Sequence, residues 1–134
     1  MQKHRDLTLR RLAQFASFDG LLGQLYPKHA PVKLAVFHAS GRIPFSEAQQ
    51  GTYQPLEIGA QFGPQWSTHW VKVYIELPAE WAGSEVHFLF DSNSEGCVWQ
   101  NGQPQQGLTG SSNGWDSTSL RKEYCLTKSA SGPE

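Results

Sequence analysis

The stretch FGPQWSTHWVKVYIEL, residues 62–77, contains the clearest secondary-structure signal in the chain. From Trp70 to Leu77 aliphatic residues occupy every second position, which is typical of a strand with one buried face. The side chains predicted to face the core are those of Val71, Val73, Ile75 and Leu77. The side chains predicted on the opposite face are those of Trp70, Lys72, Tyr74 and Glu76. Pro78 ends the predicted strand, because proline has no backbone N–H for the sheet.

Other short segments repeat this strand pattern. Residues 34–38 and 85–91 alternate in the same way, and Val86, Phe88 and Phe90 are predicted to face inward. Asn101-Gly102 separates residues 97–100 from 103–105, and this dipeptide supplies the positive φ angles that a type I′ hairpin turn requires. A weaker strand is predicted over residues 121–127. Short strands with turns between them predict a mainly β fold, a β-sandwich of the jelly-roll or galactose-binding-like kind.

The first 30 residues follow a different pattern. Between residues 7 and 25, apolar side chains recur at helical spacing, and Asp19-Gly20 interrupts the series. The organisation predicted is a short N-terminal helical arm over 1–30 and a β-sandwich domain over 31–134. The polar ending KSASGPE follows the last predicted strand directly. We therefore expect the sandwich to be C-terminally incomplete, truncated before its last strands.

Length and composition argue against several classes of protein. A chain of 134 residues holds one domain at most, with room for one sizeable core. Its net charge of −1 disfavours a nucleic-acid partner, which needs a clustered basic face. No apolar run approaches the ~20 residues of a membrane span, and no signal peptide is visible. Cys97 and Cys125 form no CxxC pair and are expected to be reduced thiols in a cytoplasmic protein.

A search for catalytic and metal-binding motifs finds none that we regard as a site. His4 and Asp6 form the only His-x-Asp pair, but metal sites need three or four convergent ligands. The same residues begin HRDL, which imitates a kinase catalytic loop, but Arg11 stands where that loop needs asparagine. Neither cysteine has a plausible histidine partner by sequence. We predict no catalytic residue and no metal ligand in this chain.

The tryptophans allow two interpretations. Aromatic rings complement the flat apolar faces of sugars, and Asp91, Asn93 and Glu95 could bind hydroxyl groups. Alternatively, Trp81 and Trp99 fill the ends of the sandwich, and the FGPQW turn seats Trp66 against a neighbouring domain. Trp115 lies in a polar loop and is the best candidate for an exposed aromatic contact. The residues of a possible sugar-binding or domain-contact surface are Trp66, His69, Trp70, Asp91, Glu95 and Trp115.

Several spaced blocks resemble the N-terminal region of the cytosolic and vacuolar type of α-mannosidase, glycoside hydrolase family 38. The blocks are Phe62–Trp66, His69-Trp70, Pro78–Gly83, Glu95–Trp99 and Gln106–Leu108. They cover nearly the whole chain and keep the family's order. Val71 departs from the pattern, which favours an aromatic residue at that position.

The resemblance implies a parent enzyme that trims α-linked mannose from oligosaccharides with retention of configuration. Such enzymes use two carboxyl groups about 5 Å apart, and this family adds a divalent metal, zinc or cobalt. The resemblance places that machinery in a later catalytic domain, so this chain needs no cofactor of its own.

We therefore expect a non-catalytic domain that packs against that catalytic domain or assembles subunits into a homo-oligomer. The alternative is a stand-alone carbohydrate-binding module for mannose-rich glycans. A fragment or splice product without activity is a third possibility. The expected location is cytoplasmic, with the vacuole or lysosome as the alternative.

Overall fold

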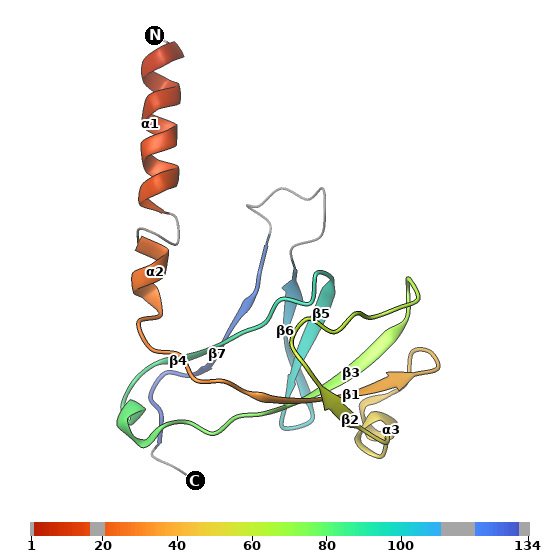
Figure 1. Ribbon diagram of the computed structural model, residues 1–134. Helices are drawn as coiled ribbons and strands as arrows, with labels where there is room; N and C mark the ends of the chain where they lie inside the picture. Colours follow the sequence, from red (N-terminus) through yellow and green to blue (C-terminus); the bar gives the residue numbers. More distant parts are fainter. Residues whose placement is uncertain (1, 17–20, 111–119, 132–134) are drawn as a thin grey trace. The chain divides into compact units, whose positions relative to one another are not determined.

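The computed structural model describes residues 2–16, 21–110 and 120–131 (Figure 1). The chain divides into two compact units, residues 1–31 and 32–134. The first contains two helices, α1 (Gln2–Phe15) and α2 (Leu21–Leu25), where the periodicity predicted helix. Apolar side chains along them are exposed, among them Leu9, Leu12 and Phe15. Within the described parts of the chain, no helix combines the length and apolar character that crossing a membrane requires.

The second unit begins with a three-stranded antiparallel sheet in the order β2-β1-β3. Its strands are β1 (Lys33–Ala39), β2 (Gln54–Leu56) and β3 (Thr68–Tyr74), and the short helix α3 (Phe45–Gln49) lies between β1 and β2 in the chain. The sequence pattern did not predict β2. Pro55 obscures it, but β2 is an edge strand, where a missing N–H is tolerated.

The predicted strand over 70–77 is displaced in the structure. β3 begins two residues earlier, at Thr68, and ends at Tyr74, so Ile75 and Leu77 lie beyond it. The partner strand explains these limits, because β1 pairs Ala39 with Thr68 and Lys33 with Tyr74. The predicted contrast between a buried and an exposed face is also wrong. Side chains on both faces are half-buried along the strand, and only Tyr74 at its end is exposed.

A second antiparallel pair joins β4 (Val86–Leu89) to β7 (Glu123–Thr127), and a 3₁₀ turn, η1 (Ala79–Trp81), precedes β4 (Figure 1). Here the predicted alternation is confirmed, since Val86 and Phe88 are buried and Phe90, one residue past β4, is half-buried. The register shifts between Val86 and His87. Such bulges change the direction in which neighbouring side chains point.

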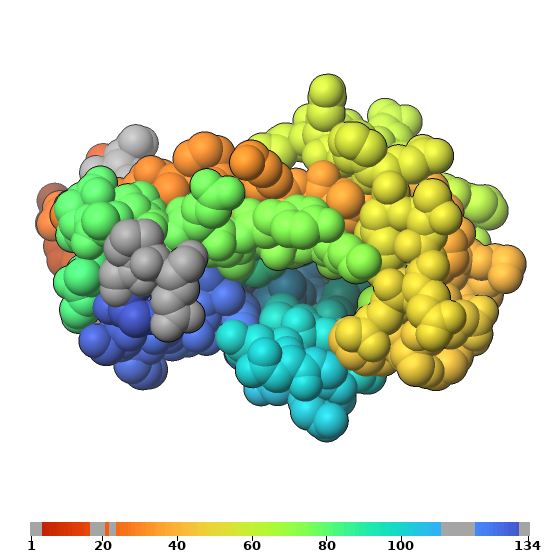
Figure 2. Space-filling model, turned by 90° about the horizontal axis from the view of Figure 1, so that it is seen from below, coloured from red at the N-terminus to blue at the C-terminus, as the bar shows by residue number. Residues whose placement is uncertain are grey.

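A hairpin of β5 (Glu95–Gln100) and β6 (Gln103–Thr109) forms the third antiparallel pair. Asn101 and Gly102 have φ angles of 53° and 75°, as the predicted type I′ turn requires. Figure 2 shows the tip of this hairpin, in cyan, beside the α3 segment, in yellow.

The core of this unit is drawn from all three groups of strands. Its buried hydrophobic residues, within the described ranges, are Val36, Ala48, Val86, Phe88, Leu108 and Ala130. They come from β1, α3, β4 and β6 and from the residues after β7. The architecture is mainly β with antiparallel sheets, which confirms the predicted fold class of a β-sandwich.

Candidate functional site

Three aromatic rings from separate elements meet on one face of β3. Phe45 of α3 stacks on Trp99 of β5, with ring centroids 5.0 Å apart and planes 2° from parallel. Trp70 of β3 contacts both, at centroid distances of 6.0 Å to Phe45 and 5.7 Å to Trp99. We call Phe45, Trp70 and Trp99 the tryptophan cluster. It joins the β5–β6 hairpin to the first sheet.

The tryptophan cluster is a packing contact that remains partly open. Trp99 is 37% exposed. The buried indole nitrogen Nε1 of Trp70 has no hydrogen-bond partner among the described residues. An indole N–H that binds a sugar must be accessible to that ligand, whereas the N–H of Trp70 is buried. The geometry therefore favours the packing interpretation of Trp70 and Trp99 over a sugar platform at these two rings.

His69 lies on the opposite face of β3 from Trp70 and faces another histidine. Its Nδ1 is 2.7 Å from Nδ1 of His38, its cross-strand partner on β1, and its Nε2 is 2.7 Å from Oγ of Ser67. The ring of Phe62 packs against His69 at 4.9 Å. Burial, and to a lesser extent the neighbouring His38, lowers the pKa of His69. If both rings were protonated, each Nδ1 atom would carry a hydrogen, and the two N–H groups would repel each other. The geometry therefore favours the neutral form of His69.

The loop between β2 and β3, residues 57–67, presents large apolar side chains to the outside. Trp66 and Ile58 are each 93% exposed, and Phe62 is 38% exposed. Trp66 also has a φ angle of 68°, which is uncommon for a residue other than glycine. The backbone at this position thus adopts an unfavourable conformation while its ring makes little contact within the chain. We call residues 57–67 the apolar loop.

Asp91 serves the local structure of its own turn. Its Oδ2 forms an ion pair with Nζ of Lys122 at 2.7 Å, and its Oδ1 accepts a hydrogen bond from the backbone N–H of Asn93 at 2.9 Å. Gly110 fits closely against this turn, since a Cβ there would lie 2.7 Å from Asp91 Oδ1. These contacts tie the entrance of β5 to β6 and to the residues before β7.

Glu95, four residues further on, lines a cleft of about 350 Å³ beside the hairpin. The residues around it are Glu95, Gly96, Gly107, Leu108, Thr109 and Arg121. Two backbone hydrogen bonds between Thr109 and Arg121 hold Arg121 beside the end of β6. The cleft thus combines a carboxylate, a guanidinium and a hydroxyl group, which are all able to bind sugar hydroxyls. Arg121 was not among the predicted site residues, because 26 positions separate it from Glu95 in the sequence.

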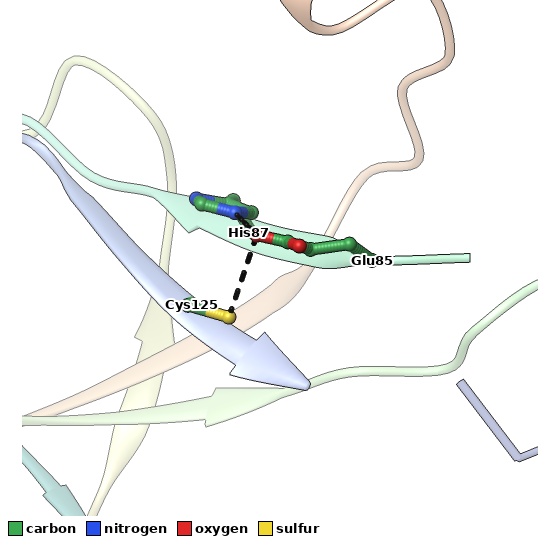
Figure 3. A group of neighbouring side chains, drawn as sticks. All are labelled: Glu85, His87 and Cys125. Atoms are coloured by element: carbon green, nitrogen blue, oxygen red, sulfur yellow. Dashed lines mark hydrogen bonds and ion pairs between the residues drawn. The ribbon is translucent and has the colours of Figure 1, made fainter. Parts of the chain in front are cut away.

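A third group of polar side chains gathers on the β4–β7 pair (Figure 3). Glu85, His87 and Cys125 each place one donor atom within 4.8 Å of the other two. The prediction that neither cysteine has a histidine partner is therefore wrong. His87 and Cys125 are 38 positions apart in sequence, and the β4–β7 register makes them direct neighbours.

The remaining predicted residues do not join these groups. His4 and Asp6 both lie on α1, where residues two apart point in directions about 200° apart, so they cannot bind one ion together. Trp115 lies outside the described residues. Trp66, His69 and Trp70 are close in sequence but lie in three different places. Trp66 belongs to the apolar loop, and His69 and Trp70 lie on opposite faces of β3.

Comparison with known proteins agrees with this architecture. A family model described as "Alpha-mannosidase, jelly roll domain" matches residues 30–134. The chain belongs to this α-mannosidase family. The chain is 41% identical over 113 residues to "Alpha-mannosidase 2C1" of Homo sapiens, an alignment that covers 80% of this chain and 11% of the human protein.

A second relative extends the match along this jelly-roll chain. "Alpha-mannosidase G" of Dictyostelium discoideum is 36% identical over 141 aligned positions, which cover 100% of this chain and 13% of that protein. The chain thus spans roughly a tenth of the length of these curated relatives. The resemblance to the α-mannosidase family is confirmed for the jelly-roll region.

Proposed function

We propose that this jelly-roll chain is a non-catalytic domain of an α-mannosidase and that its apolar loop packs against the catalytic region of that enzyme. The observation that carries the proposal is the exposure of Trp66 and Ile58, both 93%. Exposed large apolar side chains that gather on one loop mark contact surfaces, and tryptophan is enriched at the centre of such contacts. The relatives' much greater length supports a large partner region within one polypeptide.

The non-catalytic part of the proposal is supported by what the polar residues already do. Asp91 is paired with Lys122, and His69 contacts His38 and Ser67. His4 and Asp6 diverge on α1 and do not fit the His and Asp ligand set that the family resemblance implies for a catalytic metal. In this proposal the chemistry, including the divalent metal, belongs to the catalytic region. The parent enzyme then trims α-linked mannose from oligosaccharides in the cytoplasm.

The first test measures hydrolysis of a chromogenic α-mannoside by the 134-residue chain alone. We expect no turnover, because retaining glycosidases need two carboxyl groups about 5 Å apart on a rigid support. Turnover that rises in proportion to purified chain and disappears with a metal chelator would contradict the non-catalytic assignment.

The second test uses the complete polypeptide that the gene encodes. Replacing Trp66 and Ile58 together by serine should lower the melting temperature and speed proteolytic cleavage between the two regions, because the contact loses its apolar anchors. The control is Tyr74→Ser, which removes an aromatic ring that is also exposed but lies at the end of β3, outside the apolar loop. Equal effects of the two variants would contradict docking through the apolar loop.

A second candidate function is carbohydrate binding, and the Glu95–Arg121 cleft is the observation that favours it. Its size falls within the ~300–1,000 Å³ of small-molecule pockets, and its polar groups suit sugar hydroxyls. The expected ligand is a mannose-containing oligosaccharide. This function is compatible with a packing role, because the apolar loop contributes nothing to the lining of the cleft.

Titration of the chain with mannose oligomers, followed by tryptophan fluorescence and calorimetry, tests this second candidate. Saturable binding that Arg121→Ala and Glu95→Gln both abolish would support it. Lys33→Ala is the control, because Lys33 lies on β1 and pairs with exposed Glu76. Absence of binding, or binding unchanged by both cleft variants, would rule the cleft out.

A further inference from the structure

The outer face of the β4–β7 pair gathers three side chains that bind transition metals in proteins. Val86 and Phe88 point to the core, so Glu85 and His87, which alternate with them, point away from it. Cys125 stands directly opposite His87 on β7. The register shift between Val86 and His87 occurs at this point. Figure 3 shows the three side chains converging from the two strands.

The distances within this group are close to those of a tetrahedral metal site. His87 Nε2 lies 2.8 Å and Cys125 Sγ 4.0 Å from the same oxygen, Oε1 of Glu85. Donors bound to one zinc ion lie roughly 3.3–3.6 Å apart, as follows from bond lengths of about 2.0 Å to nitrogen or oxygen and 2.3 Å to sulfur. Small side-chain rotations therefore suffice to bring the three donors around one ion.

A cation already occupies part of this space. Nζ of Lys128 lies 2.8 Å from Glu85 Oε1. The Nε2 atom of His87 lies at the same distance, 2.8 Å, from this oxygen, so two nitrogen groups already gather around one carboxylate. The Lys128 side chain is 77% exposed and can move into water when another cation arrives. The group thus attracts positive charge, and its present partner is replaceable.

We propose that Glu85, His87 and Cys125 form a binding site for Zn²⁺. A thiolate, an imidazole and a carboxylate suit zinc, whereas Mg²⁺ and Ca²⁺ prefer oxygen ligands alone. Water takes the fourth position, because the group lies at the surface. Binding replaces the S–H bond of Cys125 by a Zn–S bond and releases that proton to solvent, while the imidazole binds as the neutral ring.

The bound ion links two strands that lie far apart in sequence. β4 ends at Leu89 and β7 begins at Glu123, so a zinc ion held by both closes a long loop. Zinc is therefore expected to raise the melting temperature of the chain with increasing free concentration, as for any ligand of the folded state. This inference does not depend on the proposed function, since it uses none of the residues of the apolar loop.

The test titrates zinc into the untagged, reduced 134-residue chain in competition with a chromophoric chelator. We expect one ion per chain, and with Co²⁺ as the probe a thiolate-to-cobalt charge-transfer band. Cys125→Ser removes the sulfur ligand and should weaken zinc binding by about a hundredfold or more and abolish that band. His87→Gln provides a second ligand variant. Circular dichroism checks that each variant is folded.

Two further variants give the test its controls. Cys97→Ser removes the other free cysteine, which is exposed on β5, and should leave zinc affinity and the cobalt band unchanged. Lys128→Gln removes the competing ammonium group and should tighten binding by roughly threefold to tenfold. Equal zinc affinity in the unmodified chain and in Cys125→Ser would overturn the proposal, as would loss of binding in Cys97→Ser alone.

Discussion

The β4–β7 pair and the β1–β3 pair follow the same antiparallel pattern but are covered differently. On β4, Val86 and Phe88 are buried while the alternate residues face outward. On β3, both faces are half-buried, because the tryptophan cluster covers one face and Phe62 packs over His69 on the other. Alternation in sequence thus predicted both strands, but it predicted the buried face correctly on β4 and not on β3, where both faces are covered.

The largest effect that distinguishes the two pairs is expected for Phe88→Ala. Phe88 is buried on β4 and stacks on Phe90 at 5.6 Å, so truncation leaves a cavity in the core. We expect a loss of about 3–5 kcal/mol in the free energy of unfolding, measured by urea denaturation. The matched control is Leu89→Ala, the exposed neighbour on the same strand, which should lose far less. Similar losses would mean that β4 does not separate a core face from an outer face.

Trp99→Ala tests the covering of the second face of β3. Trp99 stacks on Phe45 and contacts Trp70, yet it is partly exposed, so we expect a loss of about 2 kcal/mol, between that of a buried and that of a surface aromatic. Trp66→Ala in the isolated chain is the control and should change stability by less than about 0.5 kcal/mol, because its ring is almost fully exposed. If the two variants unfold at the same urea concentration as the unmodified chain, the tryptophan cluster does not hold the hairpin to the sheet.

Lys72→Ala tests whether packing on the face of β3 that carries Trp70 also holds a charged residue in place. The Lys72 ammonium group lies 3.9 Å from the centroid of the Tyr53 ring, and the Tyr53 hydroxyl donates a hydrogen bond to the Ala48 carbonyl. Loss of this cation–π contact should cost about 0.5–1 kcal/mol in thermal or urea unfolding.

A matched lysine on β1 separates this contact from a general effect of charge. Lys33 pairs with exposed Glu76 at 3.5 Å, so Lys33→Ala should cost less than about 0.5 kcal/mol. The reverse order of the two lysine variants would show that Tyr53 does not hold Lys72.

The smallest expected effect is a pH dependence that arises on the β1–β3 pair. Burial and His38 lower the pKa of His69, so the unfolded chain binds a proton more readily than the folded one. The contribution of His69 to the free energy of unfolding is fully present above the ordinary histidine pKa of about 6.5. It is lost as the pH falls through the lower pKa that His69 has in the folded state. The melting temperature should therefore decline gently between about pH 7.5 and pH 5.5.

The same measurement on His69→Gln should show a flatter pH profile, because glutamine does not titrate in this range. His29→Gln, in the first unit, is the control and should keep the slope of the unmodified chain. A slope that survives in His69→Gln would assign the pH dependence to another group.

Much of the fold was predictable because its signals are local. The Asn101-Gly102 turn, the alternation around Val86 and Phe88, and the helical spacing of α1 each depend on residues close in the chain. β2 was missed because it is three residues long and contains Pro55. The end of β3 was misplaced because the length of its partner β1 limits the pairing, and that length is not visible in residues 75–77 themselves.

The candidate sites were less predictable, because each combines residues that are distant in sequence. Glu95 was predicted, but Arg121 joins it only through the backbone contacts between Thr109 and Arg121. Cys125 was predicted to lack a histidine neighbour, and the register of β4 with β7 supplies one. Trp70 was a candidate for sugar binding, but its ring packs against Phe45 and Trp99, and its indole nitrogen is buried.

By itself the sequence determined the kind of most main elements, the mainly β class and, through its spaced sequence blocks, the resemblance to the α-mannosidase family. The element types and the fold class depend on backbone preferences and on the period of apolar residues, which act over a few positions, whereas the family follows from the resemblance of the spaced blocks. Only the tertiary structure decided which faces are covered and which polar groups meet. The physical reason is that strand pairing and ring packing join residues tens of positions apart, and their partners are chosen by the geometry of the whole sheet rather than by neighbours in the chain.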